Sequence, residues 1–166
     1  MKTRLIPFLF ASAIAILLSV HAQAAASRTA SGSYVDARIY LKGADLNAWY
    51  DLMRRLRFNF DEVCGDTFCE GEFSNIEALR YVCSVDRVTG RIGVCAWTFA
   101  ASHEEVELAT GEIGLQRGFW QCRTPLAPHT TIEELVTALA GSRPMFAPLP
   151  SSNRTIMDGL VTDCFY

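Results

Sequence analysis

The sequence predicts an α+β fold: an antiparallel β-meander of about four strands with two or three helices packed on it, stapled by disulfides. Two segments repeat apolar residues at helical spacing, and strand-like segments separated by turn residues lie between them. Helices placed before and after such a run pack on one face of the sheet, because each element must bury its apolar side. The six cysteines are the third observation, since an even number in an exported chain indicates a disulfide framework.

The N-terminal segment is typical of a secretory signal peptide. Two cations precede an apolar run over 5–20, and Ala22 and Ala24 are small residues two apart, as a signal peptidase requires. A membrane anchor is the alternative, but the run is shorter than the roughly 20 residues that span a bilayer. We therefore expect cleavage of 1–24, a periplasmic or secreted location, and no membrane contact of the mature form.

The mature chain is predicted to be a single acidic domain. A loose leader covers 25–33 and the domain covers 34–166, a length that can bury a core without a partner. Of 15 basic residues, Lys2 and Arg4 fall in the signal peptide, which leaves 13 against 18 acidic residues and a net charge of −5. This balance argues against nucleic acid as a partner.

All the cysteines lie in the mature part, and we expect three disulfides. An oxidising compartment preserves disulfides, whereas a zinc site would need a C-x-x-C pair that this chain lacks. The spacing does not choose among the pairings of the six residues. The predicted disulfide residues are Cys64, Cys69, Cys83, Cys95, Cys122 and Cys164.

The first predicted elements are an edge strand over 34–41 and a helix over 45–58. The strand segment is rich in β-branched and aromatic residues. Asp45 is a candidate N-cap of the helix, and arginines in its last turns suit the negative end of the helix dipole. The apolar residues at helical spacing, which predict its buried face, are Leu46, Trp49, Tyr50, Met53 and Leu56.

A β-hairpin is the clearest local structure in the sequence. Its strands cover 78–86 and 91–101, and Gly90 suits the left-handed position that ends a three-residue loop. The register that follows places three pairs on one face: Leu79 with Phe99, Tyr81 with Trp97, and Cys83 with Cys95. The two cysteines would then be close enough to bond, although each could also reach another partner.

Two more strands are predicted at 104–109 and 112–122, turning at Thr110 and Gly111. The apolar residues in the second of these strands, together with the prolines that follow it, agree with a strand that ends near Cys122.

Two helices complete the predicted fold. The first covers 131–140, with a capping box of Thr130 and Glu133 and a C-terminal glycine at Gly141. The second is a short helix over 153–164.

The best candidate for function is the acidic segment 61–77, interpreted as a loop held by disulfides. A loop held rigid in this way loses little entropy on binding, which favours recognition of another protein. We therefore interpret the chain as an exported binding or inhibitor-type module whose partner is a basic envelope or extracellular protein. The predicted partner-binding residues are Asp61, Asp66, Glu70 and Glu72.

Two alternatives remain open at this stage. In the first, the acidic loop holds calcium in a structural module, although the loop lacks the order of oxygen ligands of an EF-hand. In the second, the chain is a small hydrolase in which His103 or His129 acts with nearby carboxylates. The sequence holds neither an H-E-x-x-H motif nor a G-x-S-x-G motif. We therefore expect no catalytic, metal or cofactor residues, and favour binding over catalysis.

Overall fold

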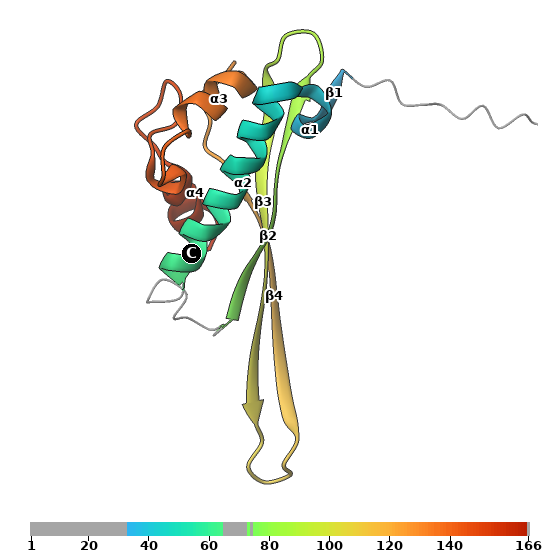
Figure 1. Cartoon of the computed structure of the whole chain (residues 1–166). Coiled ribbons are helices and arrows are strands. Elements are labelled where there is room, and N and C mark those ends of the chain that lie inside the picture. The colour runs from blue at the N-terminus through green and yellow to red at the C-terminus, as the bar shows by residue number, and fades with distance from the viewer. Residues whose placement is uncertain (1–32, 65–72, 74, 166) are drawn as a thin grey trace, which may run out of the picture. The chain divides into compact units, whose positions relative to one another are not determined.

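A computed structural model of the chain describes residues 33–64, 73 and 75–165. It confirms the predicted α+β fold: a four-stranded antiparallel sheet in the order β1-β2-β3-β4 with helices on one face (Figure 1). The elements are β1 (Tyr34–Asp36), α1 (Ala37–Tyr40), α2 (Gly43–Cys64), β2 (Asn75–Asp86), β3 (Ile92–Val106), β4 (Ile113–Arg123), α3 (Ile132–Ala138), the 3₁₀ turn η1 (Pro144–Phe146) and α4 (Ile156–Asp163).

The core lies between the sheet and the helices that cover its upper half in Figure 1. Alternate residues of β2 and β3 point into it, as a strand with one buried face requires. At its centre Phe99 lies 4.8 Å from Phe60 of α2 and 5.0 Å from Phe165 beyond α4, measured between ring centroids. Residues that precede β2 and residues that follow β4 in the sequence therefore stabilise the same stretch of β3.

Two disulfides reinforce this covered part of the sheet. Cys83 of β2 is bonded to Cys95 of β3, as the predicted register allowed, and Cys122 of β4 is bonded to Cys164 at the end of α4. Cys69 lies outside the described residues, as does the side chain of Cys64, so a third disulfide stays a prediction.

The predicted strand over 34–41 is wrong in its second half. Only Tyr34–Asp36 pairs with β2, and a short helix, α1, follows at once. The Asp36 carboxylate explains the change, because it accepts a hydrogen bond from the Arg38 backbone N–H and so caps that helix.

Helix α2 is longer than predicted at both ends. It begins at Gly43, so Asp45 lies in its first turn and is not its N-cap, and it continues to Cys64. Tyr50 is exposed, contrary to prediction, whereas Leu52 and Phe60 are buried with Trp49 and Leu56. The buried face is therefore rotated about the helix axis, away from Tyr50 and toward Leu52.

The longer helix also changes the place of the arginines. Arg54 and Arg55 lie in the middle of α2, where they no longer face the negative end of its dipole. Arg55 instead donates hydrogen bonds to the carbonyls of Ala140 and Gly141, beyond the C-terminus of α3. This side chain ties α2 to the segment that follows α3.

The predicted hairpin register is confirmed for Tyr81–Trp97 and Cys83–Cys95 but is wrong for Leu79. A β-bulge between Ala78 and Arg80 shifts the pairing by one residue, so that Ala78 faces Phe99. Leu79 is consequently turned to the exposed face of the sheet. Gly90 has the left-handed backbone expected of it (φ +69°).

The prediction of two further strands, at 104–109 and 112–122, is partly wrong. Residues 104–109 do not form a strand of their own, because β3 runs without a break to Val106 and pairs with β4 from Ala96 to Val106. The predicted turn and the strand over 112–122 are confirmed, with Gly111 at φ +76°. The result is one long hairpin.

Both C-terminal helices are confirmed, with shifted caps. The box at α3 is made by Thr131 and Glu134, one residue later than predicted, and Leu139 is its C-cap instead of Gly141. Helix α4 has its own capping box, in which the Thr155 hydroxyl accepts a hydrogen bond from the Asp158 backbone N–H and the Asp158 carboxylate accepts one from the Thr155 backbone N–H. The buried Thr130 is engaged elsewhere, since its hydroxyl donates to the Ala127 carbonyl.

Candidate functional site

The predicted acidic site is described only in part. Asp61 is exposed in the last turn of α2, whereas Asp66, Glu70 and Glu72 lie outside the described residues. The boundaries of the predicted loop over 61–77 are wrong at both ends, because its first residues continue α2 and its last belong to β2. Within β2, Glu77 forms an ion pair with Arg57 of α2.

The two histidines of the hydrolase alternative lie far apart. His129 is exposed in a turn with a left-handed backbone (φ +68°), next to Thr130, whose carbonyl accepts from the Ile92 backbone N–H. His103 is part of the same strand as Ile92, eleven residues further on. At the rise of an extended strand this is about 36 Å, so the two side chains do not form one site.

Metal-ligand clusters and membrane-spanning helices are both absent among the described residues. These residues contain no cluster of three or more His, Cys, Asp or Glu side chains that would hold a metal ion. None of their helices combines the length and apolar character that crossing a bilayer requires.

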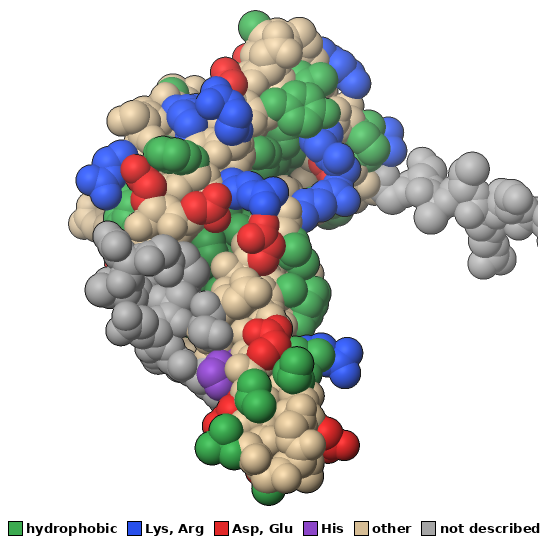
Figure 2. Space-filling model, turned by 60° about the horizontal axis from the view of Figure 1, so that its bottom comes forward, with side chains coloured by type: hydrophobic (Ala, Val, Ile, Leu, Met, Phe, Trp, Pro, Cys, Tyr) green, Lys and Arg blue, Asp and Glu red, His purple; other side chains and the backbone are tan. Residues whose placement is uncertain are grey.

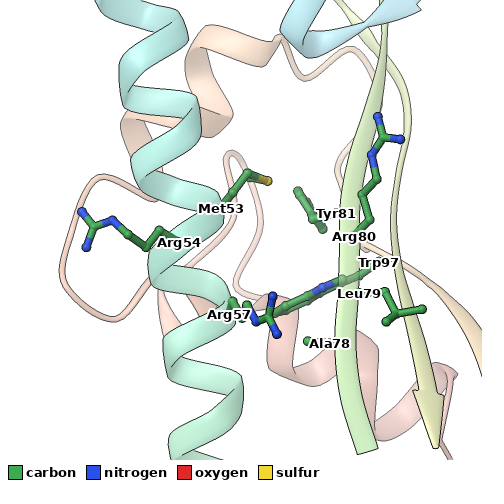
Figure 3. Close-up of a pocket in the computed structure, with 8 residues that line it drawn as sticks. All are labelled: Met53, Arg54, Arg57, Ala78, Leu79, Arg80, Tyr81 and Trp97. Atoms are coloured by element: carbon green, nitrogen blue, oxygen red, sulfur yellow. The ribbon is translucent and has the colours of Figure 1, made fainter.

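A groove with a volume of about 370 Å³ lies between α2 and β2 (Figure 3). Met53 and Tyr81 point into it, whereas Arg54 points away from β2 and Arg80 lies on the far side of that strand. Tyr81 is satisfied by a hydrogen bond to Thr124 Oγ1 (2.8 Å), and burial raises the pKa of its phenol above the usual value. The groove therefore has an apolar floor, and the arginines Arg54 and Arg80 at its border do not point into it.

The most unusual surface is the outer half of the β3–β4 hairpin. We call residues 102–117 the β-arm; it extends well past the helices, as Figure 1 shows. Its inner limit is marked by Trp120, whose ring folds over Gly118 and contacts Phe73 edge-on. All of residues 104–117 are exposed.

The β-arm combines apolar side chains with carboxylates (Figure 2). It holds four glutamates and one arginine, a net charge of −3 with its histidine neutral. Exposed apolar patches on a domain that can bury its own core mark interaction sites. The exposed apolar side chains of the arm and the adjoining part of β4 are Val106 (56 %), Leu108 (93 %), Ile113 (70 %), Leu115 (53 %) and Phe119 (69 %).

The turn of the β-arm is well formed by its own sequence. The Glu107 backbone N–H donates to the Glu112 carbonyl (2.8 Å), and the Gly111 N–H donates to the Glu107 carbonyl (2.8 Å). The Glu107 carboxylate also accepts from the Ala109 N–H. These bonds make the arm a regular hairpin in the absence of helix packing.

The outer edge of β4 is an unpaired strand edge. Hydrogen bonds link Glu107 with Glu112 at the turn and Thr124 with Cys95 at the base, and the register between them has no bulge. Bonded and non-bonded pairs alternate in an antiparallel ladder, so the even-numbered residues of β4 bond to β3. The residues that direct their N–H and C=O groups to the open edge are therefore Ile113, Leu115, Arg117, Phe119 and Gln121.

The other side of the sheet is protected. There β1 covers the end of β2, and the bulge at Leu79 distorts the rest of its edge. Bulges and short covering strands are devices by which proteins avoid edge pairing. No other described strand pairs with β4 along its outer edge.

Sequence reasoning missed the β-arm as a candidate site. It divided β3 into two strands, so that Glu104 and Glu105 appeared to begin a separate surface strand. The available signal was the apolar alternation of Ile113, Leu115 and Phe119 in a segment with no helix to cover it.

Comparison of the chain with models of protein families, with curated proteins and with solved structures finds no match.

Proposed function

We propose that this protein is an exported, disulfide-stabilised binding module that recognises an extended segment of another polypeptide by strand addition to the open edge of β4. The observation that carries the proposal is the unbulged edge of β4, with five residues whose backbone groups face outward. Addition of a strand satisfies such groups and is a recurring mode of peptide recognition.

The side chains of the edge agree with this role. Ile113, Leu115 and Phe119 lie on the same face of β4 and are more than half exposed, so a bound strand would cover part of each. A solvent-exposed apolar edge is otherwise prone to aggregation, which favours a use for it. The signal peptide predicted from the sequence and the two disulfides support a location outside the cytosol.

The acidic segment 61–77 is still a candidate binding site. A basic partner for Asp61, Asp66, Glu70 and Glu72 stays a prediction, and the net negative charge of the β-arm is compatible with it. The arm differs from that segment because its described backbone offers a specific mode of binding.

The proposal is tested with a photo-crosslinking amino acid in place of Leu115 in the exported protein. We expect discrete crosslinked species from this position and none from the same amino acid at Val88, a more exposed residue in the other hairpin turn. Arg117→Pro removes an outward N–H and should abolish the crosslink, whereas Arg117→Ala keeps that N–H and should retain it. Identical adducts from both positions, or adducts that survive Arg117→Pro, would contradict strand addition at β4.

A further inference from the structure

We infer that the segment bound at β4 is the β4 strand of a second copy of this chain, paired antiparallel about a two-fold axis beside Gln116. This inference rests on the proposed function, because it needs β4 to accept an added strand. It specifies the partner, the direction and the register.

The charges along β4 favour a second copy. The turn end of the hairpin carries the carboxylates of Glu107 and Glu112, the base end of β4 carries Arg123, and Arg117 lies near the middle of the strand. A strand that is negative at one end and positive at the other is complementary to itself when the two copies run in opposite directions. Each Arg123 would then lie beside the acidic turn of the partner.

The faces of the sheet restrict the register. A two-fold axis perpendicular to the sheet keeps the helices of both copies on one face. Residues directly opposite each other point to the same face, so odd-numbered residues of one β4 must lie opposite odd-numbered residues of the other. Like charges directly opposite each other are destabilising, which disfavours an axis at Arg117. An axis at Leu115 would leave Ile113 opposite Arg117.

An axis at Gln116 gives the best side-chain pairs. Ile113 of each copy then lies opposite Phe119 of the other, which makes two apolar cross-strand pairs on the exposed face. Leu115 lies opposite Arg117, and Glu104, the β3 neighbour of Leu115, offers that arginine a carboxylate on the same face. The two arms thus pair their exposed apolar residues and place Arg117 and Arg123 of each copy near carboxylates of the other.

The first experiment measures the mass of the mature protein in solution by light scattering over about 1 to 500 µM. We expect a concentration-dependent dimer that weakens at high salt, because part of the complementarity is between exposed charges. Arg117→Pro should weaken the dimer at least about tenfold relative to Arg117→Ala, since only the proline removes an edge donor. Circular dichroism of both variants checks that each is folded. A protein that is monomeric at every concentration would overturn the inference.

The second experiment tests the register. Across the proposed axis Gln116 faces Gln116 of the partner in a non-hydrogen-bonded pair, at a Cα separation of about 4.5 Å that a disulfide can bridge. Gln116→Cys should therefore form a covalent dimer under mild oxidation much faster than the exposed control Val88→Cys. Equal rates for the two variants would overturn this register.

Amide exchange separates the two proposals. In dilute monomer the N–H groups of Ile113, Leu115, Arg117 and Phe119 should exchange quickly and become protected as the dimer forms. If they stay unprotected at high concentration while Leu115 crosslinks to a different protein, such as a basic extended segment, the self-pairing inference fails and the proposed function stands. If they are protected already in the monomer, the edge is not open and both fail.

Discussion

The two halves of the β3–β4 hairpin share one register but differ in what stabilises them. In the covered half, Trp97 and Phe99 pack among helix residues and both disulfides lie close by. In the β-arm the same two strands are linked by their ladder and turn, Ser102 at the inner end still pairs with Asn75 of β2, and residues 104–117 are all exposed. Packing thus stabilises the base of the hairpin, whereas in the outer half the backbone ladder leaves the edge of β4 unpaired among the described strands.

The largest expected difference between the halves is in the effect of removing an aromatic ring. Phe99→Ala empties a fully buried site in contact with Phe60, Trp97 and Phe165, and should lower the free energy of unfolding by about 4 to 5 kcal/mol. Phe119→Ala, on the exposed face one pair along, should change it by less than about 0.5 kcal/mol. Urea unfolding of the two variants measures both values; losses of similar size would contradict the comparison.

The disulfides should matter next most. Their expected contribution grows with the length of the loop that they close, and Cys122–Cys164 closes 42 residues against 12 for Cys83–Cys95. We expect about 4 kcal/mol from the first bond and about 3 kcal/mol from the second, measured as the loss of unfolding free energy in the paired Cys→Ala variants. A larger loss at the shorter loop would mean that native packing, and not chain entropy, decides the order.

The covered half should also respond to alkaline pH through Tyr81. Burial raises the pKa of this phenol in the folded state above the value of about 10 for an unfolded chain. The folded state then holds the proton more tightly, so this contribution to stability is present below pH 10 and is lost as the pH rises further. Thermal unfolding from neutral to alkaline pH should show this decline.

Tyr81→Phe is the matched variant for that experiment. It should remove the alkaline decline that Tyr81 causes, and lower stability at neutral pH by about 1 kcal/mol through the lost bond to Thr124. If the decline persists unchanged in the variant, another group is responsible.

The smallest expected effects concern the two hairpin turns. The Asp86 carboxylate accepts hydrogen bonds from the backbone of Thr89, the Thr89 hydroxyl and the backbone of Val88, and these bonds lower its pKa. Because the folded state binds this proton more weakly than the unfolded state, the ionised Asp86 carboxylate stabilises the fold at neutral pH. This stabilisation is lost as the pH falls through the titration of the carboxyl group. The difference in melting temperature between wild type and Asp86→Asn should therefore shrink on acidification.

Local patterns predicted much of the fold because they depend on neighbouring residues. Gly90 and Gly111 mark both hairpin turns correctly, and alternation places Tyr81 opposite Trp97. The capping residues of α3 were predicted within one position, since side-chain and backbone partners are three residues apart. The bulge at Leu79 was missed, because one inserted residue leaves the apolar pattern on either side almost intact.

By itself, the sequence determined the fold class, the hairpin turns at Gly90 and Gly111 and the register around Gly90, all of which arise from turn chemistry and periodicity over a few residues. Only the tertiary structure decided that Cys122 pairs with Cys164, that β3 continues to Val106, and that residues 104–117 are exposed. These features depend on how far the helical layer reaches over the sheet. Contacts between segments distant in sequence determine how much of the sheet the helices cover, and a local sequence pattern does not show such contacts.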